Sequence, residues 1–178
     1  DPGSRTWAST AYSPRTNHLY LPMQEFCVDT TPNPLGPGEV YTGGGAATFV
    51  RRPVPDSDGN MGKVAAVDLG DPSTTWEYRT RAANGAVATL TTGGGLVFSG
   101  NIDRTVFALD DTTGEVLWQQ RLNNVPSGFP ITYEADGRQF VAVPVGAGAW
   151  PPRAFNVLTP EIVNPPGGTT LWVFALPE

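Results

Sequence analysis

The sequence is poor in the residues that build basic surfaces and in long hydrophobic runs. Its 178 residues include one lysine, Lys63, and the formal net charge is −6. Because phosphate binding needs clustered lysine and arginine, this balance argues against a nucleic-acid partner. No apolar run approaches the roughly 18 residues of a membrane-spanning helix, so no membrane span is expected.

Cysteine is almost absent, and Cys27 is the sole example. One cysteine cannot form an internal disulfide, which leaves two interpretations open. Cys27 is either a buried free thiol or the partner of a cysteine outside this chain. The sequence begins at Asp1, with no initiator methionine and no signal peptide, so we expect a mature, processed or trimmed chain.

The sequence also lacks the 3.6-residue hydrophobic period of amphipathic helices. Glycine and proline, which interrupt helices and form turns, contribute 21 and 18 residues. Short runs of valine, leucine, phenylalanine, tyrosine and threonine lie between them. This pattern predicts an all-β fold.

A repeated unit stands out against this background. Asp110 is followed by Trp118 after eight residues, and Asp68 is followed by Trp76 at the same spacing, 42 residues earlier. A third copy begins at the C-terminal segment "WVFALPE" (172–178), which matches "TVFALDD" (105–111). A long loop from residue 146 to 168 accounts for its larger offset of 67 residues.

The unit predicts a strand, a turn and a returning strand. Asp110 is expected to cap the turn, and Trp118 is expected to fill the space between neighbouring sheets. A period near 42 residues with four short strands is typical of a β-propeller blade, with a β-sandwich of similar hairpins as the alternative. The chain would hold about three and a half blades, so we expect another chain or precursor segment to complete the ring.

The other segments fit this scheme. Hairpins are expected over residues 8–24, over 86–101 and around the Asp136-Gly137 turn, with a final strand at 171–176. Residues 28–62 are expected to form a long loop containing one strand, at 46–50. Within it, "DSDGN" (56–60) lacks the terminal glutamate of a calcium loop and is interpreted as a surface turn.

Four segments, in this order, resemble the C-terminal part of pyrroloquinoline-quinone (PQQ)-dependent alcohol and sugar dehydrogenases. They are "GSRTWASTAYSPRTNHLYLPMQEFC" (3–27), "GNMGKVAAVDL" (59–69), "GGGLVFSGNIDRTVFALDDTTGEVLWQQRL" (93–122) and "SGFPITYEADGRQFVAVPVGAGAW" (127–150). The resemblance implies that residues 1–178 are a C-terminal segment of an eight-bladed quinoprotein propeller.

The resemblance also implies an activity. It is the periplasmic oxidation of an alcohol, polyol, sugar or aldehyde by hydride transfer to PQQ beside a bound calcium or lanthanide ion. Electrons would pass to a cytochrome or to ubiquinone. The catalytic aspartate and metal ligands of such enzymes belong to the N-terminal half, so no catalytic base and no metal ligand are assigned here. The small segment around Ala86, where some relatives carry tryptophan, favours a substrate bulkier than methanol.

Three residues are expected to contact the cofactor through this resemblance. Thr6 takes the place of a family asparagine near the rim of PQQ, and Trp7 follows it. Trp150 matches a tryptophan in a glycine-rich turn that lines the cofactor and substrate pocket. The resemblance further implies a disulfide between Cys27 and a cysteine just upstream of Asp1.

Two other functions remain as alternatives. One is a non-catalytic scaffold propeller with the same type of tryptophan repeat, which would not be expected to carry the "GSRTW" and "GAGAWPP" segments. The other is a carbohydrate-binding β domain, which would present exposed aromatic side chains.

Overall fold

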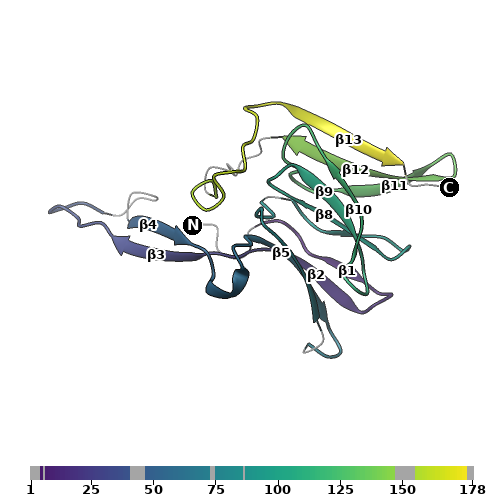
Figure 1. Ribbon diagram of the computed structural model, residues 1–178, viewed down its shortest axis with the longest axis horizontal. Helices are drawn as coiled ribbons and strands as arrows, with labels where there is room; N and C mark the ends of the chain where they lie inside the picture. Colours follow the sequence, from purple (N-terminus) through teal and green to yellow (C-terminus); the bar gives the residue numbers. More distant parts are fainter. Residues whose placement is uncertain are drawn as a thin grey trace.

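The computed structural model describes residues 5, 7–40, 47–72, 75–85, 87–146 and 155–175. Three antiparallel sheets fan out beside one another, and a separate hairpin projects from them (Figure 1). The strands are β1 Ala11–Ser13, β2 His18–Gln24, β3 Cys27–Pro32, β4 Ala47–Arg52, β5 Gly62–Asp68, β6 Thr75–Thr80, β7 Leu90–Thr91, β8 Leu96–Asn101, β9 Thr105–Asp110, β10 Val116–Arg121, β11 Ile131–Ala135, β12 Arg138–Gly146 and β13 Thr169–Ala175. In the described part, the helical content is one 3-10 turn, Pro55–Ser57. The all-β prediction is confirmed.

Two sheets share one topology. Their strand orders are β1-β2-β5-β6 and β7-β8-β9-β10, so each is a four-stranded antiparallel meander. The third sheet has the order β11-β12-β13 in the described residues. First strands β1 and β7 contact one another, which sets the sheets side by side as blades about a common inner edge. This arrangement is that of a partial β-propeller.

The Asp110 turn has the predicted structure. Its carboxylate oxygen Oδ1 accepts hydrogen bonds from the backbone N–H groups of Thr112, at 2.8 Å, and Thr113, at 2.9 Å. The Gly114 N–H then donates to the Asp110 carbonyl, and Gly114 adopts a φ of 75°, which suits glycine. These contacts close the turn that leads β9 into β10.

We predict that Asp110→Ala lowers the free energy of unfolding by about 1 kcal/mol at neutral pH, since the turn loses its side-chain acceptor. The Thr112 N–H bond, offset in part by desolvation and aided by the Thr113 bonds, lowers the pKa of Asp110. A lowered folded-state pKa gives a stabilisation that is complete above the unfolded-state pKa and is lost as pH falls through the folded-state value. Urea unfolding measured between pH 7 and pH 2 should therefore show that the difference in free energy of unfolding between Asp110→Ala and wild type becomes smaller in acid. The control Asp110→Asn keeps the acceptor oxygen and should lose this pH dependence; an unchanged difference in acid for Asp110→Ala would contradict the mechanism.

Tryptophan packing joins the first sheet to the second, as predicted. The Trp76 indole of β6 lies over Gly114, where an added Cβ would come within 2.5 Å of the ring. Its Nε1–H donates to the Asp111 carbonyl at 3.3 Å, and the Tyr20 hydroxyl donates to the same oxygen at 2.7 Å. Burial raises the pKa of Tyr20, so this hydroxyl stays protonated as a donor at neutral pH.

An ion pair with a buried carboxylate reinforces this contact between sheets. The Asp111 carboxylate is fully buried, and the Arg15 guanidinium from the β1–β2 turn binds both of its oxygens. Ser13 and Thr112 hydroxyls also donate to it, at 3.5 and 3.2 Å. The two acids that adjoin in the sequence therefore have different structural roles, since Asp110 closes a turn and Asp111 holds two sheets together.

The apolar core lies mainly between sheets. One cluster packs Tyr20, Val64 and Ala66 of the first sheet on Val97, Phe107 and Leu109 of the second. Another packs Phe98, Val106 and Ala108 on Val141, Val143 and Val145 of the third. Each sheet is therefore stabilised chiefly by burial against its neighbour.

The prediction of a long loop with one strand over residues 28–62 is wrong in the number of strands. β3 and β4 form a regular hairpin that runs from Cys27 paired with Arg52 to Pro32 paired with Ala47, so the segment contains two strands of this arm. Most of its side chains are exposed, and the arm extends away from the sheets (Figure 1). Sequence patterning failed here because neither strand buries a face, which removes the usual alternation of apolar and polar residues.

Cys27 is exposed, so the interpretation of a buried free thiol is wrong. It lies at the first position of β3, where the chain leaves the body of the molecule for the arm. No helix in the described ranges has the length and hydrophobicity of a membrane span.

Candidate functional site

The segments that enter the first strand of each sheet gather at one edge of the molecule. The Thr89 N–H donates to the Ser9 carbonyl at 3.2 Å, and the Ala88 N–H donates to the Gly128 carbonyl at 2.9 Å. Val87 and Gly128 form a parallel bridge. The segments at Ser9 and Thr89, which are 80 residues apart in sequence, and the segment at Gly128 therefore lie in a row and form the inner edge of the fan.

An aromatic pair lies at this inner edge. Trp7, just before β1, and Phe129, just before β11, contact each other edge to face, with ring centroids 5.6 Å apart. Their exposed fractions are 46% and 50%. A contacting pair of large aromatic rings that both keep half of their surface exposed can form the wall of a site for a planar or apolar ligand.

The sequence did not single out Phe129. Its one local signal is an aromatic residue between Gly128 and Pro130, in a segment that otherwise has the residues of a turn. The contact itself joins residues from different blades, so only the three-dimensional arrangement brings it out. Thr6 and Trp150, the other two predicted cofactor contacts, lie outside the described residues.

β12 also ends at this edge. The Gly146 N–H, at the last position of β12, donates to the Val125 carbonyl at 2.8 Å, and Val125 belongs to the loop that carries Phe129. Asn124 donates from Nδ2 to the Gly168 carbonyl at 3.4 Å. Gly146 and Gly168 are therefore both hydrogen-bonded to the loop that carries Phe129.

Unpaired polar atoms lie beneath this end of the first sheet. Asn84 is 2% exposed, and neither its Oδ1 nor its Nδ2 has a hydrogen-bond partner. Gln24 donates from Nε2 to the Gly85 carbonyl at 3.0 Å, while its Oε1 is also unpaired. Such atoms are usually satisfied by ordered water or a ligand, so this end of the sheet offers free donors and acceptors.

Two of the small residues near position 86 do not widen a pocket. Ala82 and Ala83 are buried in a core cluster with Met61, Ile102 and Phe155. Asn84 is also buried, at 2% exposed. The suggestion of extra room at this segment therefore concerns Gly85 and Ala86, and Ala86 lies outside the described residues.

The described residues offer aromatic walls and hydrogen-bonding groups and no evident catalytic acid-base pair. Within the described ranges, no group of three or more histidine, cysteine, aspartate or glutamate residues is placed to hold a metal ion. The two acidic residues of the repeat have structural roles. Asp110 accepts hydrogen bonds that close the β9–β10 turn, and Asp111 forms the ion pair with Arg15. This edge can therefore contribute part of a binding site.

Comparisons with known proteins identify relatives of this chain. Residues 56–141 match the family model of the glucose/ethanol/alcohol dehydrogenase β-propeller domain (PQQ). The 1-butanol dehydrogenase (quinone) of Thauera butanivorans is 32% identical over 182 residues, which cover 99% of this chain and 27% of that protein. Methanol dehydrogenase (cytochrome c) subunit 1 of Methylobacterium organophilum is 32% identical over 147 residues, covering 79% of this chain and 23% of its own length.

The same relationship appears in three dimensions. A europium-containing methanol dehydrogenase superposes on 98% of this chain with a TM-score of 0.78 and 26% identity, and 34% of that enzyme is covered. The chain thus spans about a quarter to a third of the proteins it matches. Sheet topology, the spacing of the tryptophan hairpins and these matches agree with one another, and the chain is part of a β-propeller of the PQQ-dependent glucose/ethanol/alcohol dehydrogenase family.

Proposed function

We propose that residues 1–178 form the C-terminal segment of a PQQ-dependent dehydrogenase that oxidises an alcohol, polyol, sugar or aldehyde. The observation that carries this proposal is the half-exposed Trp7–Phe129 pair at the inner edge, within a chain whose relatives are named as quinoprotein and methanol dehydrogenases. The family match favours this function over a scaffold propeller.

The residues present fit one side of a planar cofactor. PQQ, when bound, would accept a hydride from the carbon that bears the substrate hydroxyl. Trp7 and Phe129 would pack against its apolar face or edge and exclude water from it. The Thr6 hydroxyl can donate or accept one hydrogen bond, and Trp150 would line the pocket beside the substrate.

Proton abstraction and metal binding would fall to residues outside this chain. A calcium or lanthanide ion would be held mainly by the N-terminal part of the propeller; one relative is named a lanthanide-dependent methanol dehydrogenase, and one structural neighbour contains europium. Electrons would pass to a cytochrome or to ubiquinone, and relatives are named as cytochrome c-linked enzymes. Such a protein would work in the periplasm.

Reconstitution of the complete protein tests this proposal. Apoprotein given PQQ with calcium or a lanthanide should gain quinone absorbance and dye-linked activity on an alcohol, sugar or aldehyde. Trp7→Ala should weaken PQQ binding by about tenfold or more, because a large apolar contact is lost. Leu69→Ala, which changes an exposed hydrophobic residue at the opposite end of the first sheet, is the control and should leave PQQ affinity unchanged. No response to PQQ with any substrate would favour the scaffold function.

The same activity assay can measure which substrates the reconstituted protein prefers. The absence of a tryptophan at Ala86 favours turnover of a bulky polyol or sugar over methanol. Comparing kcat/KM for methanol and for a hexose measures this directly. A clear preference for methanol would contradict the argument from Ala86 and leave the dehydrogenase proposal intact.

We also propose that Cys27 forms a disulfide with a cysteine just upstream of Asp1, which would tie this chain to the preceding polypeptide. The exposure of Cys27 at the base of the arm supports an accessible thiol. Intact mass of the complete protein after alkylation should show the Cys27 thiol blocked before reduction and modified after it. Modification of Cys27 without reduction would exclude the link.

A further inference from the structure

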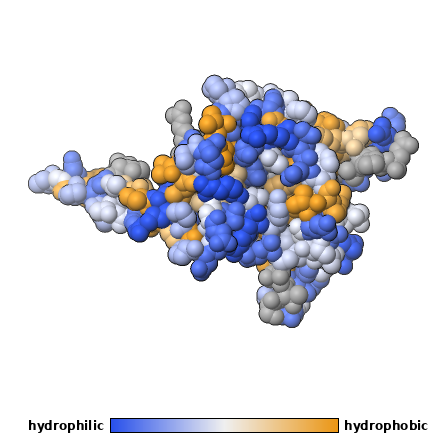
Figure 2. Space-filling model, in the orientation of Figure 1, coloured by the Kyte–Doolittle hydropathy of each residue, from blue (hydrophilic) through white to orange (hydrophobic). Residues whose placement is uncertain are grey.

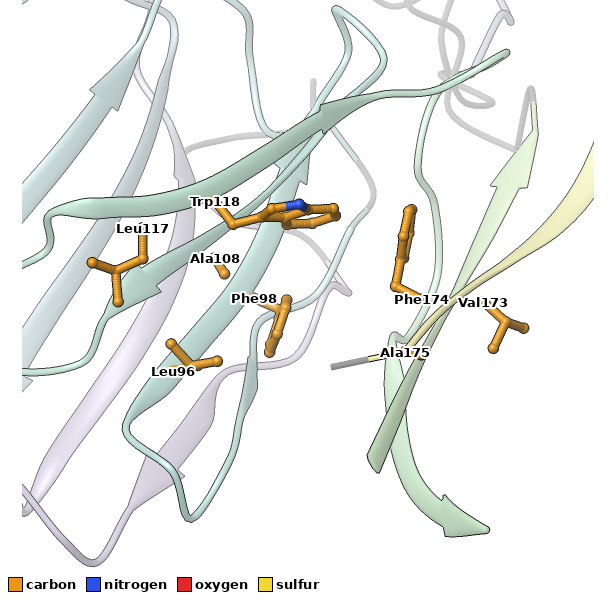
Figure 3. Close-up of a pocket in the computed structure, with 8 residues that line it drawn as sticks. All are labelled: Leu96, Phe98, Ala108, Leu117, Trp118, Val173, Phe174 and Ala175. Carbon is orange, nitrogen blue, oxygen red and sulfur yellow. The ribbon is translucent and has the colours of Figure 1, made fainter. Parts of the chain in front are cut away.

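The third sheet contacts the second sheet through apolar side chains. Trp118 of β10 and Phe174 of β13 face one another, with ring centroids 4.9 Å apart (Figure 3). Hydrophobic patches lie on this side of the molecule, over β10 and the β12–β13 edge (Figure 2). The third sheet reaches the first sheet by a different route, through the chain that connects β12 to β13.

The described part of this connection contains a compact segment, residues 155–162. Figure 1 shows the chain before β13 leaving the third sheet and running toward the base of the arm. The Leu158 and Thr159 N–H groups both donate to the Phe155 carbonyl, at 2.8 and 3.0 Å, and the Ile162 N–H donates to the Thr159 carbonyl at 3.0 Å. Phe155, Thr159 and Ile162 are buried. The 155–162 segment therefore folds on itself and buries one side against the body of the molecule.

The buried side of the 155–162 segment packs on connections that belong to the first two sheets. Phe155 and Ile162 share an apolar cluster with residues before β5, after β6, in the β8–β9 turn and after β10: Met61, Ala82, Ala83, Ile102 and Val125. The Phe155 ring also contacts Phe26 edge to face, with ring centroids 5.6 Å apart. A connection of the third sheet thus covers one end of the other two sheets.

One side chain, Arg81, ties the 155–162 segment to the first sheet. Arg81 directly follows β6. Its Nε–H donates to the Glu161 carboxylate at 2.6 Å, and its Nη2–H donates to the Leu158 carbonyl at 2.7 Å. Its Nη1–H donates to the Gly59 carbonyl, in the connection before β5. The planar guanidinium holds these donors in a fixed fork, whereas a lysine ammonium is a single point of charge on a flexible stem.

The cluster under the 155–162 segment also supports the loop that carries Phe129. Val125 belongs both to the cluster and to this loop. Two residues further along, the Ser127 N–H donates to the Pro144 carbonyl at 2.9 Å. Phe129 follows two residues after that bond and contacts Trp7. The position of the Phe129 ring therefore depends on how firmly the loop is held.

We propose that Arg81 is a positioning residue for the Trp7–Phe129 pair. By holding the 155–162 segment against the cluster, Arg81 fixes the loop from Val125 to Phe129. This rests on the proposed function in one respect, that the aromatic pair contacts PQQ. The three bonds of Arg81 are all to the segment and to Gly59, so its effect on the cofactor is indirect.

The experiment compares Arg81→Ala and Arg81→Lys with wild type in the complete protein, by amide hydrogen exchange without cofactor. In Arg81→Ala, the amides of Leu158, Thr159 and Ser127 should exchange about tenfold faster, because hydrogen bonds from a charged donor are among the stronger ones. The amides of β9, in the centre of the second sheet, should keep their protection. Arg81→Lys keeps the charge beside Glu161 and should restore part of the protection.

The control is Arg121→Ala, which removes another surface ion pair with one contact. Arg121 donates to Asp103 at 2.7 Å, compared with 2.6 Å between Arg81 and Glu161, and the two arginine side chains are 55% and 44% exposed. Arg121→Ala should leave the exchange of the 155–162 segment and of Ser127 unchanged.

A PQQ titration gives the second readout. Arg81→Ala should raise the dissociation constant for PQQ about 2- to 30-fold, the range typical of residues that act on a site through others. Its urea unfolding midpoint should stay close to that of wild type. Unchanged exchange of Ser127, or unchanged affinity in a protein whose wild type binds PQQ, would overturn the proposal. So would an equal loss of protection in all three sheets, because it would show a general loss of stability.

Failure of the proposed function gives a different result. A wild-type protein that binds no PQQ contradicts the dehydrogenase function, and the exchange of Ser127 in Arg81→Ala still decides whether Arg81 holds the loop. A wild-type protein that binds PQQ, together with an Arg81→Ala variant of equal affinity, contradicts the positioning role alone.

Discussion

Arg15→Ala is expected to lower the free energy of unfolding by about 3 kcal/mol. Asp111 is fully buried, and Arg15 provides the positive charge that compensates it. Removing one partner of a buried ion pair leaves an uncompensated charge, a change that typically costs about 3–5 kcal/mol. We expect the lower end of that range because the Arg15 side chain is 49% exposed, so that water can replace part of its contact. Urea unfolding of the complete protein measures the change.

The control is an ion pair at the surface, joined by one contact where Arg15 and Asp111 are joined by two. Arg121 donates to Asp103 at 2.7 Å, and their side chains are 55% and 37% exposed. Arg121→Ala should therefore change stability by about 0–1 kcal/mol. Equal effects of the two arginine substitutions would show that the buried Asp111 carboxylate needs no compensation by Arg15, and the account of the contact between the first two sheets would be wrong.

Gly114→Ala is expected to destabilise the protein by about 2–5 kcal/mol. Part of the cost is conformational, because Gly114 has a φ of 75°, and an L-residue there costs about 1–2 kcal/mol. The rest is steric, because the new Cβ would lie 2.5 Å from the Trp76 ring, and overpacking of this kind typically costs about 1–3 kcal/mol. The near-ultraviolet circular dichroism of the indole should change along with the unfolding midpoint.

A second substitution, Gly137→Ala, measures the conformational cost without the steric one. Gly137 has a φ of 74° in the β11–β12 turn, and nothing lies within 4 Å of an added Cβ. Gly137→Ala should therefore cost only the conformational part, about 1–2 kcal/mol. If both alanine substitutions cost the same, Trp76 does not press on the Gly114 turn in solution, and the packing between sheets must be looser than described.

Much of the fold could be predicted because its units are local. The Asp110 turn and the Asp136-Gly137 turn depend on residues within a few positions of one another, and the structure places a hairpin at each. Trp76 and Trp118 each follow an aspartate by eight residues, and this shared spacing likewise indicated that one type of hairpin occurs twice. Residue type and spacing suffice for such elements, since the chemistry of turns and strands acts over short stretches of chain.

The contacts between blades could not be predicted in the same way. Arg15 and Asp111 are separated by 96 positions, and nothing in either segment identifies the other as its partner. The Trp7–Phe129 contact was missed for the same reason, although Trp7 itself was expected near the cofactor through the family resemblance. The β3–β4 arm was missed for a different reason, since its exposed strands carry no hydrophobic alternation.

The contact of Trp76 with the next blade has a consequence for biosynthesis. The first sheet is covered by residues Asp111 and Gly114, which follow Tyr20 by more than 90 positions. When the first sheet leaves the ribosome, its outer tryptophan has no cover until the following hairpin has also emerged. The first sheet therefore cannot reach its native packing until the next repeat has been made, because the residues that bury Trp76 lie in that repeat.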